Sequence, residues 1–217
     1  MDSLTAENNQ AETMLRLQDE INSKINKAWR DENNPWYRAI WTECAELMDH
    51  IGWKWWKSQD SDIHQMKLEL VDIWHFGLSE ILAKTENLSE AAKIVTPSII
   101  ALGVGNRGSS KAELLHAIES FTTATLSKKS FDIGSYVDLA KLSGLGADEL
   151  YKSYVGKNVL NSFRQDNGYK SGTYIKIWKD KEDNVWLSEI IESLPIDSPT
   201  FATDLYSKLE CAYKSII

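Results

Sequence analysis

Apolar residues along the chain recur at spacings of three and four, which is the period of an amphipathic α-helix. The first such segment extends from about residue 10 to residue 29 and carries one apolar stripe, formed by Met14, Leu17, Ile21 and Ile25. Four prolines and eleven glycines in 217 residues leave few breaks in the chain, and this favours helices over many short strands. The pattern therefore predicts an all-α fold.

A second and a third helix follow at once. Asn34 and Pro35 predict the start of the second, with Asn34 as the N-cap and proline at the first helical position. It runs to about His50 and is ended by Gly52. The third runs from about residue 60 to residue 84, and its core-facing seam consists of Ile63, Met66, Leu70, Ile73, Gly77 and Ile81. The short connector predicts two antiparallel neighbours.

The second half of the chain carries further helical signals. Ser110 and Glu113 form a capping box that opens a helix through about Leu126. The segment 168–178, GYKSGTYIKIW, instead has the alternation of a β-strand. Four more helices are expected at about residues 134–142, 148–165, 185–192 and 199–215.

No internal repeat, low-complexity tract or linker divides the chain. We therefore expect a single all-α catalytic domain over residues 1–217, with or without a mobile helical part around 85–150. Its core resembles a helical bundle with two antiparallel carboxylate-bearing helices, followed by extra C-terminal helices.

The overall charge narrows the choice of partners. Acidic residues outnumber basic ones by 32 to 24, which gives a net charge of -8 and makes duplex DNA and anionic membranes poor candidates. The N-terminus, MDSLTAENN, has no apolar signal segment, and no apolar run approaches the roughly 20 residues that span a bilayer. Cys44 and Cys211 are too few for a disulfide framework. We expect a cytoplasmic protein that binds neither nucleic acid nor membrane.

Two pairs of acidic residues lie on the predicted second and third helices. Glu43 and Glu46 are three residues apart, as are Glu69 and Asp72. A helix turns about 100° per residue, so each pair projects from one face on successive turns. In a chain with 32 acidic residues such pairs are common by chance, and the spacing alone predicts only a solvated helix face.

Position around the helix changes that interpretation. Glu69, Asp72 and Phe76 share one shoulder of the buried seam, and Glu43 lies beside the apolar positions of its own helix. A phenylalanine among acids beside a core seam is unusual for a solvated face. Two antiparallel helices would bring all four carboxylates together, and like charges that close need a cation. An all-oxygen site predicts Mg²⁺ or Mn²⁺ rather than Zn²⁺.

Two other kinds of site compete with this one. A di-iron bundle would need Glu-x-x-His motifs on its helices, but His75 lies about 120° round the helix from Glu69, and no second helix supplies a matching motif. We interpret His75 and His50 as packing residues or supports for the site. Residues 103–108, GVGNRG, fit G-x-G-x-x-G, but dinucleotide binding needs a parallel sheet that the chain does not offer. We interpret that stretch as a flexible loop.

Basic and aromatic residues gather at two places. After the first carboxylate helix, Lys54 and Lys57 bracket two tryptophans, of which the first is Trp55; they can supply phosphate contacts and base stacking, or bury the rings and extend the lysines into solvent. The second cluster comprises Lys157, Asn161, Arg164, Tyr169 and Lys170. It can deliver donors to a polyphosphate, or form a solvated helix end that suits the dipole.

Gln18 and Asn22 lie four residues apart on the first helix, close to its apolar stripe. Side-chain amides can read the Watson–Crick edge of a base, because each offers both a donor and an acceptor. The spacing alone nevertheless favours placement on the surface.

Together these elements resemble a known family. LQDEIN, ECAE, KWWK, ELVD and NSFRQDNGYKSGTY occur in this order within residues 15–174. They are similar to the dimeric dUTPases of the all-α NTP pyrophosphatase (MazG-like) superfamily. ExxE with ExxD indicates only the superfamily, whereas QDxxN, KWWK and RQDxGYK point to dUTPases.

The resemblance implies a homodimer that converts dUTP, and also dUDP, to dUMP. It implies that the four carboxylates bind Mg²⁺, that Gln18, Asn22 and Trp55 contact uracil, and that Phe76 and Tyr169 enclose the deoxyribose. It further implies that phosphates are held by Lys54, Lys57, Lys157, Asn161, Arg164 and Lys170.

The mechanism we expect is metal-assisted hydrolysis of a phosphoanhydride, with Glu43 as the general base for the attacking water. Two alternatives remain open at this point. One is a MazG-type pyrophosphatase with another base preference, and the other is a helical protein that binds a nucleotide without hydrolysing it.

Overall fold

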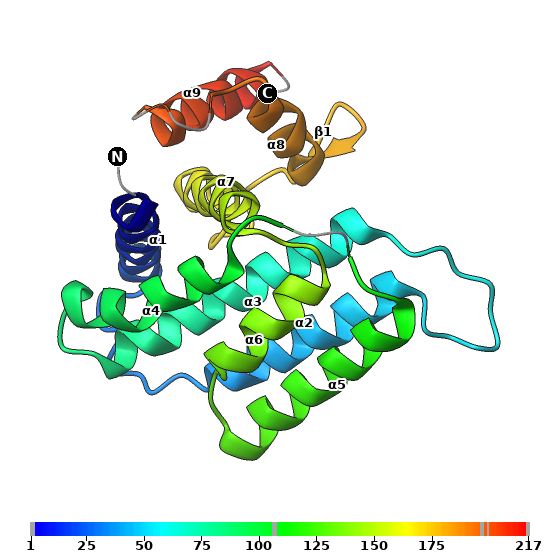
Figure 1. The fold of residues 1–217 in the computed structure, drawn as a ribbon. Coiled ribbons are helices and arrows are strands. Elements are labelled where there is room, and N and C mark those ends of the chain that lie inside the picture. Colours follow the sequence, from blue (N-terminus) through cyan, green and yellow to red (C-terminus); the bar gives the residue numbers. More distant parts are fainter. Residues whose placement is uncertain (1–2, 106–107, 196–197, 199, 216–217) are drawn as a thin grey trace. The chain divides into compact units, whose positions relative to one another are not determined.

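The structure, a computed structural model, describes residues 3–105, 108–195, 198 and 200–215 (Figure 1). Within these residues it contains nine helices and one two-stranded ribbon, so the prediction of an all-α fold is confirmed. Two compact units, Met1–Tyr151 and Lys152–Ile217, divide the chain. None of the described helices is long and apolar enough to cross a membrane.

The first unit is built around α3, which packs against α1, α2, α4 and α6. α5 covers α2 and α6. The bounds of these helices, with α7 continuing into the second unit, are α1 Ser3–Ile25, α2 Trp36–Ile51, α3 Ile63–Lys84, α4 Leu88–Leu102, α5 Lys111–Lys128, α6 Ile133–Leu142 and α7 Ala147–Asp166.

The start of α2 differs from the prediction by one residue. The Trp36 amide donates to the Asn34 carbonyl at 2.9 Å, and Pro35 has φ -79° and ψ 69°, which are the angles of an inverse γ-turn. The turn puts Pro35 itself at the N-cap, so Asn34 does not cap the helix. Gly52 ends α2 as predicted, in a left-handed conformation with φ 72°.

α3 buries the predicted seam at Met66, Leu70, Ile73 and Gly77. A Cβ atom at Gly77 would lie 2.6 Å from the ring of Phe131, so only glycine lets that ring pack against the helix. The two ends of the seam are less buried than predicted, since Ile63 is 46% exposed and Ile81 is half-buried.

α4 falls within the part around 85–150 that was expected to be helical, in a stretch where no individual helix was predicted. Asn87 caps it by accepting from the Glu90 amide, but Pro97 in its interior is a residue that usually breaks a helix. Gly103 ends α4 with φ 56°. The G-x-G-x-x-G stretch therefore follows a helix, and only an antiparallel ribbon occurs in the described parts of the chain, although residues 106–107 lie outside them.

The second unit contains the rest of α7, the ribbon β1 Ile177–Trp178 and β2 Lys181–Glu182, α8 Asp183–Glu192 and α9 Phe201–Lys214. The stretch predicted to alternate like a strand pairs only at its last two residues, while residues 168–172 form turns and residues 173–176 are irregular. Trp178 is fully buried, and Tyr174 stacks on Tyr213 at 5.4 Å between ring centroids.

Asp132 caps α6, and its removal should destabilise the first unit. Hydrogen bonds from Lys128 and from the Ser135 backbone hold the pKa of Asp132 at about 2, below its usual 3.8. We expect Asp132→Ala to lower the free energy of unfolding by about 1 kcal/mol at neutral pH. Because the folded pKa is depressed, this contribution is present above the unfolded pKa and disappears as the pH falls through the folded one. Urea unfolding measures it, and Asp138→Ala, an exposed position of α6, should have little effect.

Candidate metal and nucleotide site

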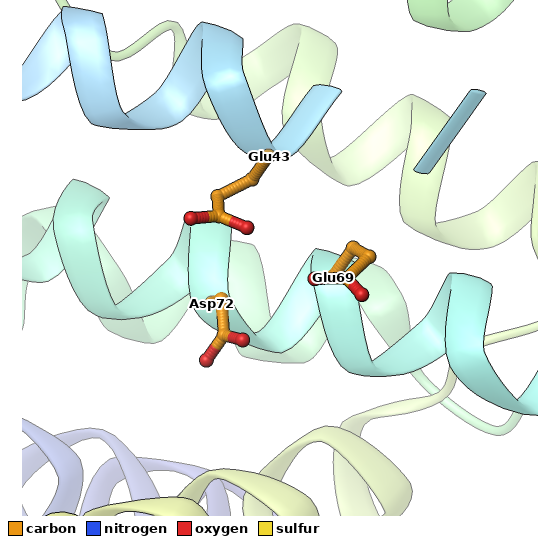
Figure 2. A group of neighbouring side chains, drawn as sticks. All are labelled: Glu43, Glu69 and Asp72. Carbon is orange, nitrogen blue, oxygen red and sulfur yellow. The ribbon is translucent and has the colours of Figure 1, made fainter. Parts of the chain in front are cut away.

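α2 and α3 bring three carboxylates together. One oxygen from each of Glu43, Glu69 and Asp72 lies within 4.8 Å of the others, and they form the one group with metal-ligand geometry in the described part of the chain. Figure 2 shows Glu43 extending from α2 towards α3, which carries the other two. The end of α2 lies beside the start of α3, because the Asp62 amide donates to the His50 carbonyl at 2.8 Å and the His50 ring contacts Glu69. The two packed helices are therefore antiparallel.

The cluster brings acidic side chains close together in a partly buried environment. Glu69 is only 9% exposed. Burial, together with the charges of Asp72, Glu69 and Glu46, raises the pKa of Glu43 from 4.5 to about 8. Three converging oxygen donors that repel one another fit a hard divalent cation, which would relieve that repulsion.

Two neighbours support the cluster differently. Glu46 is exposed and stands outside the group of converging oxygens, but its charge still acts on Glu43. The Nε2 atom of His50 lies 3.2 Å from Glu69 Oε1. His50 therefore contacts a carboxylate of the cluster, and the sequence analysis had offered a packing residue or a support for the site as its two interpretations.

Gln18 and Asn22 are buried, although their spacing favoured the surface. They are 5% and 8% exposed, and both donate to the hydroxyl of Ser79 on α3 at 2.9 Å. His75 Nδ1 lies 2.8 Å from Gln18 Oε1. A polar cluster thus joins α1 to α3, and no sequence signal predicted that Ser79 belongs to it.

Phe76 lies on α3 between the carboxylates and this polar cluster, with its ring 6.4 Å from that of Trp36. Glu69, Asp72, Phe76 and Ser79 follow one another at steps of three and four, so they share a helix face. From Asp72 to Ser79 the helix rises about 10 Å. This face therefore carries an acidic end, an aromatic middle and an amide-binding end, over a length that suits a nucleotide.

The connector between α2 and α3 holds the first basic cluster. Lys54 pairs with Asp49 at 2.7 Å, and Lys57 is exposed. Trp55 is 88% exposed, with its ring edge-to-face against Trp56. Ser79 lies about 24 Å along α3 from the start of that helix, so the structure does not bring Trp55 of this chain together with the buried amides.

The second basic cluster belongs to the second unit. Arg164 donates to Asp183 through Nε at 2.7 Å and Nη2 at 2.8 Å, and through Nη1 to Asn161 at 3.2 Å. Its guanidinium also lies 5.9 Å from the ring centroid of Tyr169. Lys157 follows the same face of α7, and Lys170 is exposed in the turn. Asp183, which is fully buried, was not foreseen; phosphate binding by this cluster remains a prediction.

Two comparisons with known proteins complement this geometry. A search of curated proteins finds no match to the chain. A protein-family model described as dUTPase matches residues 10–169, which is well over half of the chain and includes the carboxylates, the buried amides and the basic cluster of α7. The chain therefore belongs to the dUTPase family, whose activity is the hydrolysis of dUTP.

Proposed function

We propose that this dUTP diphosphatase converts dUTP to dUMP and pyrophosphate, and also hydrolyses dUDP, with Mg²⁺ held by Glu43, Glu46, Glu69 and Asp72. The observation that carries the proposal is the convergence of three carboxylate oxygens within 4.8 Å on two packed helices. Oxygen ligands from carboxylates and waters are those that Mg²⁺ prefers, and Mn²⁺ accepts the same set.

Glu43 is the general base in this proposal. When bound, Mg²⁺ would attract the phosphate oxygens and make a nearby water more acidic. In the metal-free protein, burial and neighbouring charges raise the pKa of Glu43 to about 8. A bound cation would lower this pKa and leave the carboxylate ionised, able to accept a proton from water. Its place between α2 and α3 lets it take the proton of the attacking water.

The base and the sugar lie further along α3 in this proposal. Gln18 and Asn22 bind uracil, which their burial in a polar cluster supports, and Phe76 packs on the deoxyribose. Tyr169 would cover the other face of the sugar and exclude a 2′-hydroxyl. The remaining contacts follow from the family resemblance: Trp55 with uracil, and Lys54, Lys57, Lys157, Asn161, Arg164 and Lys170 with the phosphates.

We also propose that the enzyme is a cytoplasmic homodimer. Large apolar side chains are exposed at one end of the α2–α3 pair, where Trp55, Trp56 and Ile63 are 88%, 57% and 46% exposed. Contiguous exposed apolar residues favour a protein–protein contact. Cys44 and Cys211 are free thiols, as expected in a reducing compartment.

The test is hydrolysis of dUTP by the purified chain in MgCl₂, with dUMP and pyrophosphate measured together. We expect equal amounts of the two products, loss of turnover in EDTA, and recovery with excess Mg²⁺. The values of kcat/KM for dCTP, dTTP and UTP should each be at least about 100-fold lower than for dUTP. A faster rate with another triphosphate would show a different base preference. Tight binding of dUTP without turnover would show a nucleotide-binding protein, and bound iron would show a di-iron protein.

A further inference from the structure

We propose that Ser79, assisted by His75, makes the site select uracil over cytosine by fixing the orientation of the Asn22 side-chain amide. The inference rests on the proposed function, in which Gln18 and Asn22 read the base. It adds a positioning role for Ser79, a buried serine of α3 whose hydroxyl contacts the side-chain amides of Gln18 and Asn22.

The hydrogen bonds of Ser79 allow only one arrangement of its proton. Its hydroxyl donates to the His75 backbone carbonyl, one turn earlier on α3, at 2.9 Å. A serine hydroxyl has a single proton, so the Ser79 oxygen is an acceptor in its contacts with the side chains of α1. The Nδ2 atom of Asn22 and the Nε2 atom of Gln18 each lie 2.9 Å from its oxygen. Both amides must therefore turn their NH₂ groups to Ser79.

The rest of the cluster enforces the same orientation. Gln18 Nε2 also donates to Asn22 Oδ1 at 3.1 Å, and Gln18 Oε1 lies 2.8 Å from His75 Nδ1, which therefore carries its proton. If the Asn22 amide rotated by half a turn, its oxygen would face the Ser79 oxygen and its NH₂ would face that of Gln18. While the Ser79 proton stays on the His75 carbonyl, each contact would then join two acceptors or two donors in a buried place, which is strongly unfavourable.

A fixed amide distinguishes bases that a rotating amide does not. Uracil presents an N3–H donor between two carbonyl acceptors, whereas cytosine presents an N3 acceptor beside an amino donor. An amide group offers a donor at one position and an acceptor at the other. Within the cluster, Asn22 donates one N–H to Ser79 and its Oδ1 accepts one hydrogen bond from Gln18. The second N–H of Asn22 and the second acceptor position of its oxygen can therefore serve the base. For a base that the rest of the site holds at one position, a freely rotating amide would match either uracil or cytosine, and the orientation that Ser79 fixes matches only one of them.

The experiment is to measure kcat/KM for dUTP and for dCTP with Ser79→Ala. We expect the ratio of the two values to fall by about tenfold or more, because the Asn22 amide can then rotate to meet cytosine. The matched control is Ser98→Ala, which removes a buried hydroxyl from α4 away from this cluster and should leave the ratio at the wild-type value.

A pair of changes at His75 tests the same network without touching Ser79. His75→Asn keeps an N–H donor near the position of Nδ1 and should retain the ratio of kcat/KM for dUTP to kcat/KM for dCTP. His75→Leu removes the N–H donor that faces Gln18 Oε1 and should lower this ratio. An equal loss of kcat/KM for dUTP and dCTP in both Ser79→Ala and His75→Leu would overturn the proposal. If the wild-type enzyme itself does not prefer dUTP to dCTP, the proposed function fails instead, so the two failures are distinguishable.

Discussion

Glu43→Gln should reduce kcat for dUTP by about three orders of magnitude while making the metal-free protein more stable. The loss follows because glutamine cannot accept the proton of the attacking water, and because the site loses one charged oxygen for the cation. The gain follows because glutamine is neutral without a proton, whereas Glu43, whose pKa burial and the charges of Asp72 and Glu69 raise to about 8, must bind a proton when the chain folds at neutral pH. A variant that combines these opposite effects is not explained by poor folding.

The stability gain should depend on pH in a defined direction. The folded protein holds the Glu43 proton more tightly than the unfolded chain does, with a pKa of about 8 against 4.5. The stability of the wild type therefore falls as the pH rises between these values. The difference in Tm between Glu43→Gln and the wild type, both in EDTA, should grow over that range.

Two observations check this prediction. Rapid-quench or steady-state assays with dUTP give kcat, and thermal unfolding in EDTA gives Tm. Glu119→Gln makes the same change at an exposed position of α5 and should alter neither quantity. Turnover of dUTP at the wild-type rate by Glu43→Gln would remove Glu43 from the role of general base.

The carboxylate site was predictable because helix geometry alone orders it. Glu69, Asp72 and Phe76 take their direction from the period of α3, and a short connector makes α2 its antiparallel neighbour. The sequence predicted that four carboxylates converge, and three of them do, whereas Glu46 lies outside the group. The ion itself was predicted from the chemistry of the ligands, and the uracil from the resemblance to the family.

Other features depend on contacts between distant residues, which spacing does not encode. α4 was not predicted as a separate helix because its stretch matched no motif; its interior Pro97 is a residue that usually breaks a helix, and burial of Val95, Ile99 and Leu102 stabilises it. Ser79 joins α1 to α3 through hydrogen bonds that cross about 60 positions of the sequence, and a serine in a helix carries no signature of such a role. The basic cluster on α7 had two interpretations, and choosing between them requires knowing that Asp183 faces Arg164.

Asp183→Asn should destabilise the second unit by about 3–5 kcal/mol. Asp183 is fully buried, accepts two hydrogen bonds from Arg164 and receives a third from the Tyr174 hydroxyl at 2.8 Å. Removing its charge leaves the Arg164 guanidinium largely buried, at 13% exposed, without its counter-ion. A buried cation that loses its partner is costly because water cannot reach it to replace the lost interaction.

Amide hydrogen exchange gives the measurement, since it reports local unfolding for each segment. Protection of α8 and α9 should fall by about 100-fold or more in Asp183→Asn, while that of α2 and α3 changes little. Asp180→Asn makes the same substitution at an exposed residue in the turn between β1 and β2, and should leave protection unchanged. Replacing both partners, as in Arg164→Met with Asp183→Leu, should destabilise less than Asp183→Asn, because no charge is then left buried alone. Equal protection in Asp183→Asn and Asp180→Asn would mean that the pair does not hold α7 and α8 together, and Arg164 would then be available chiefly for the phosphates.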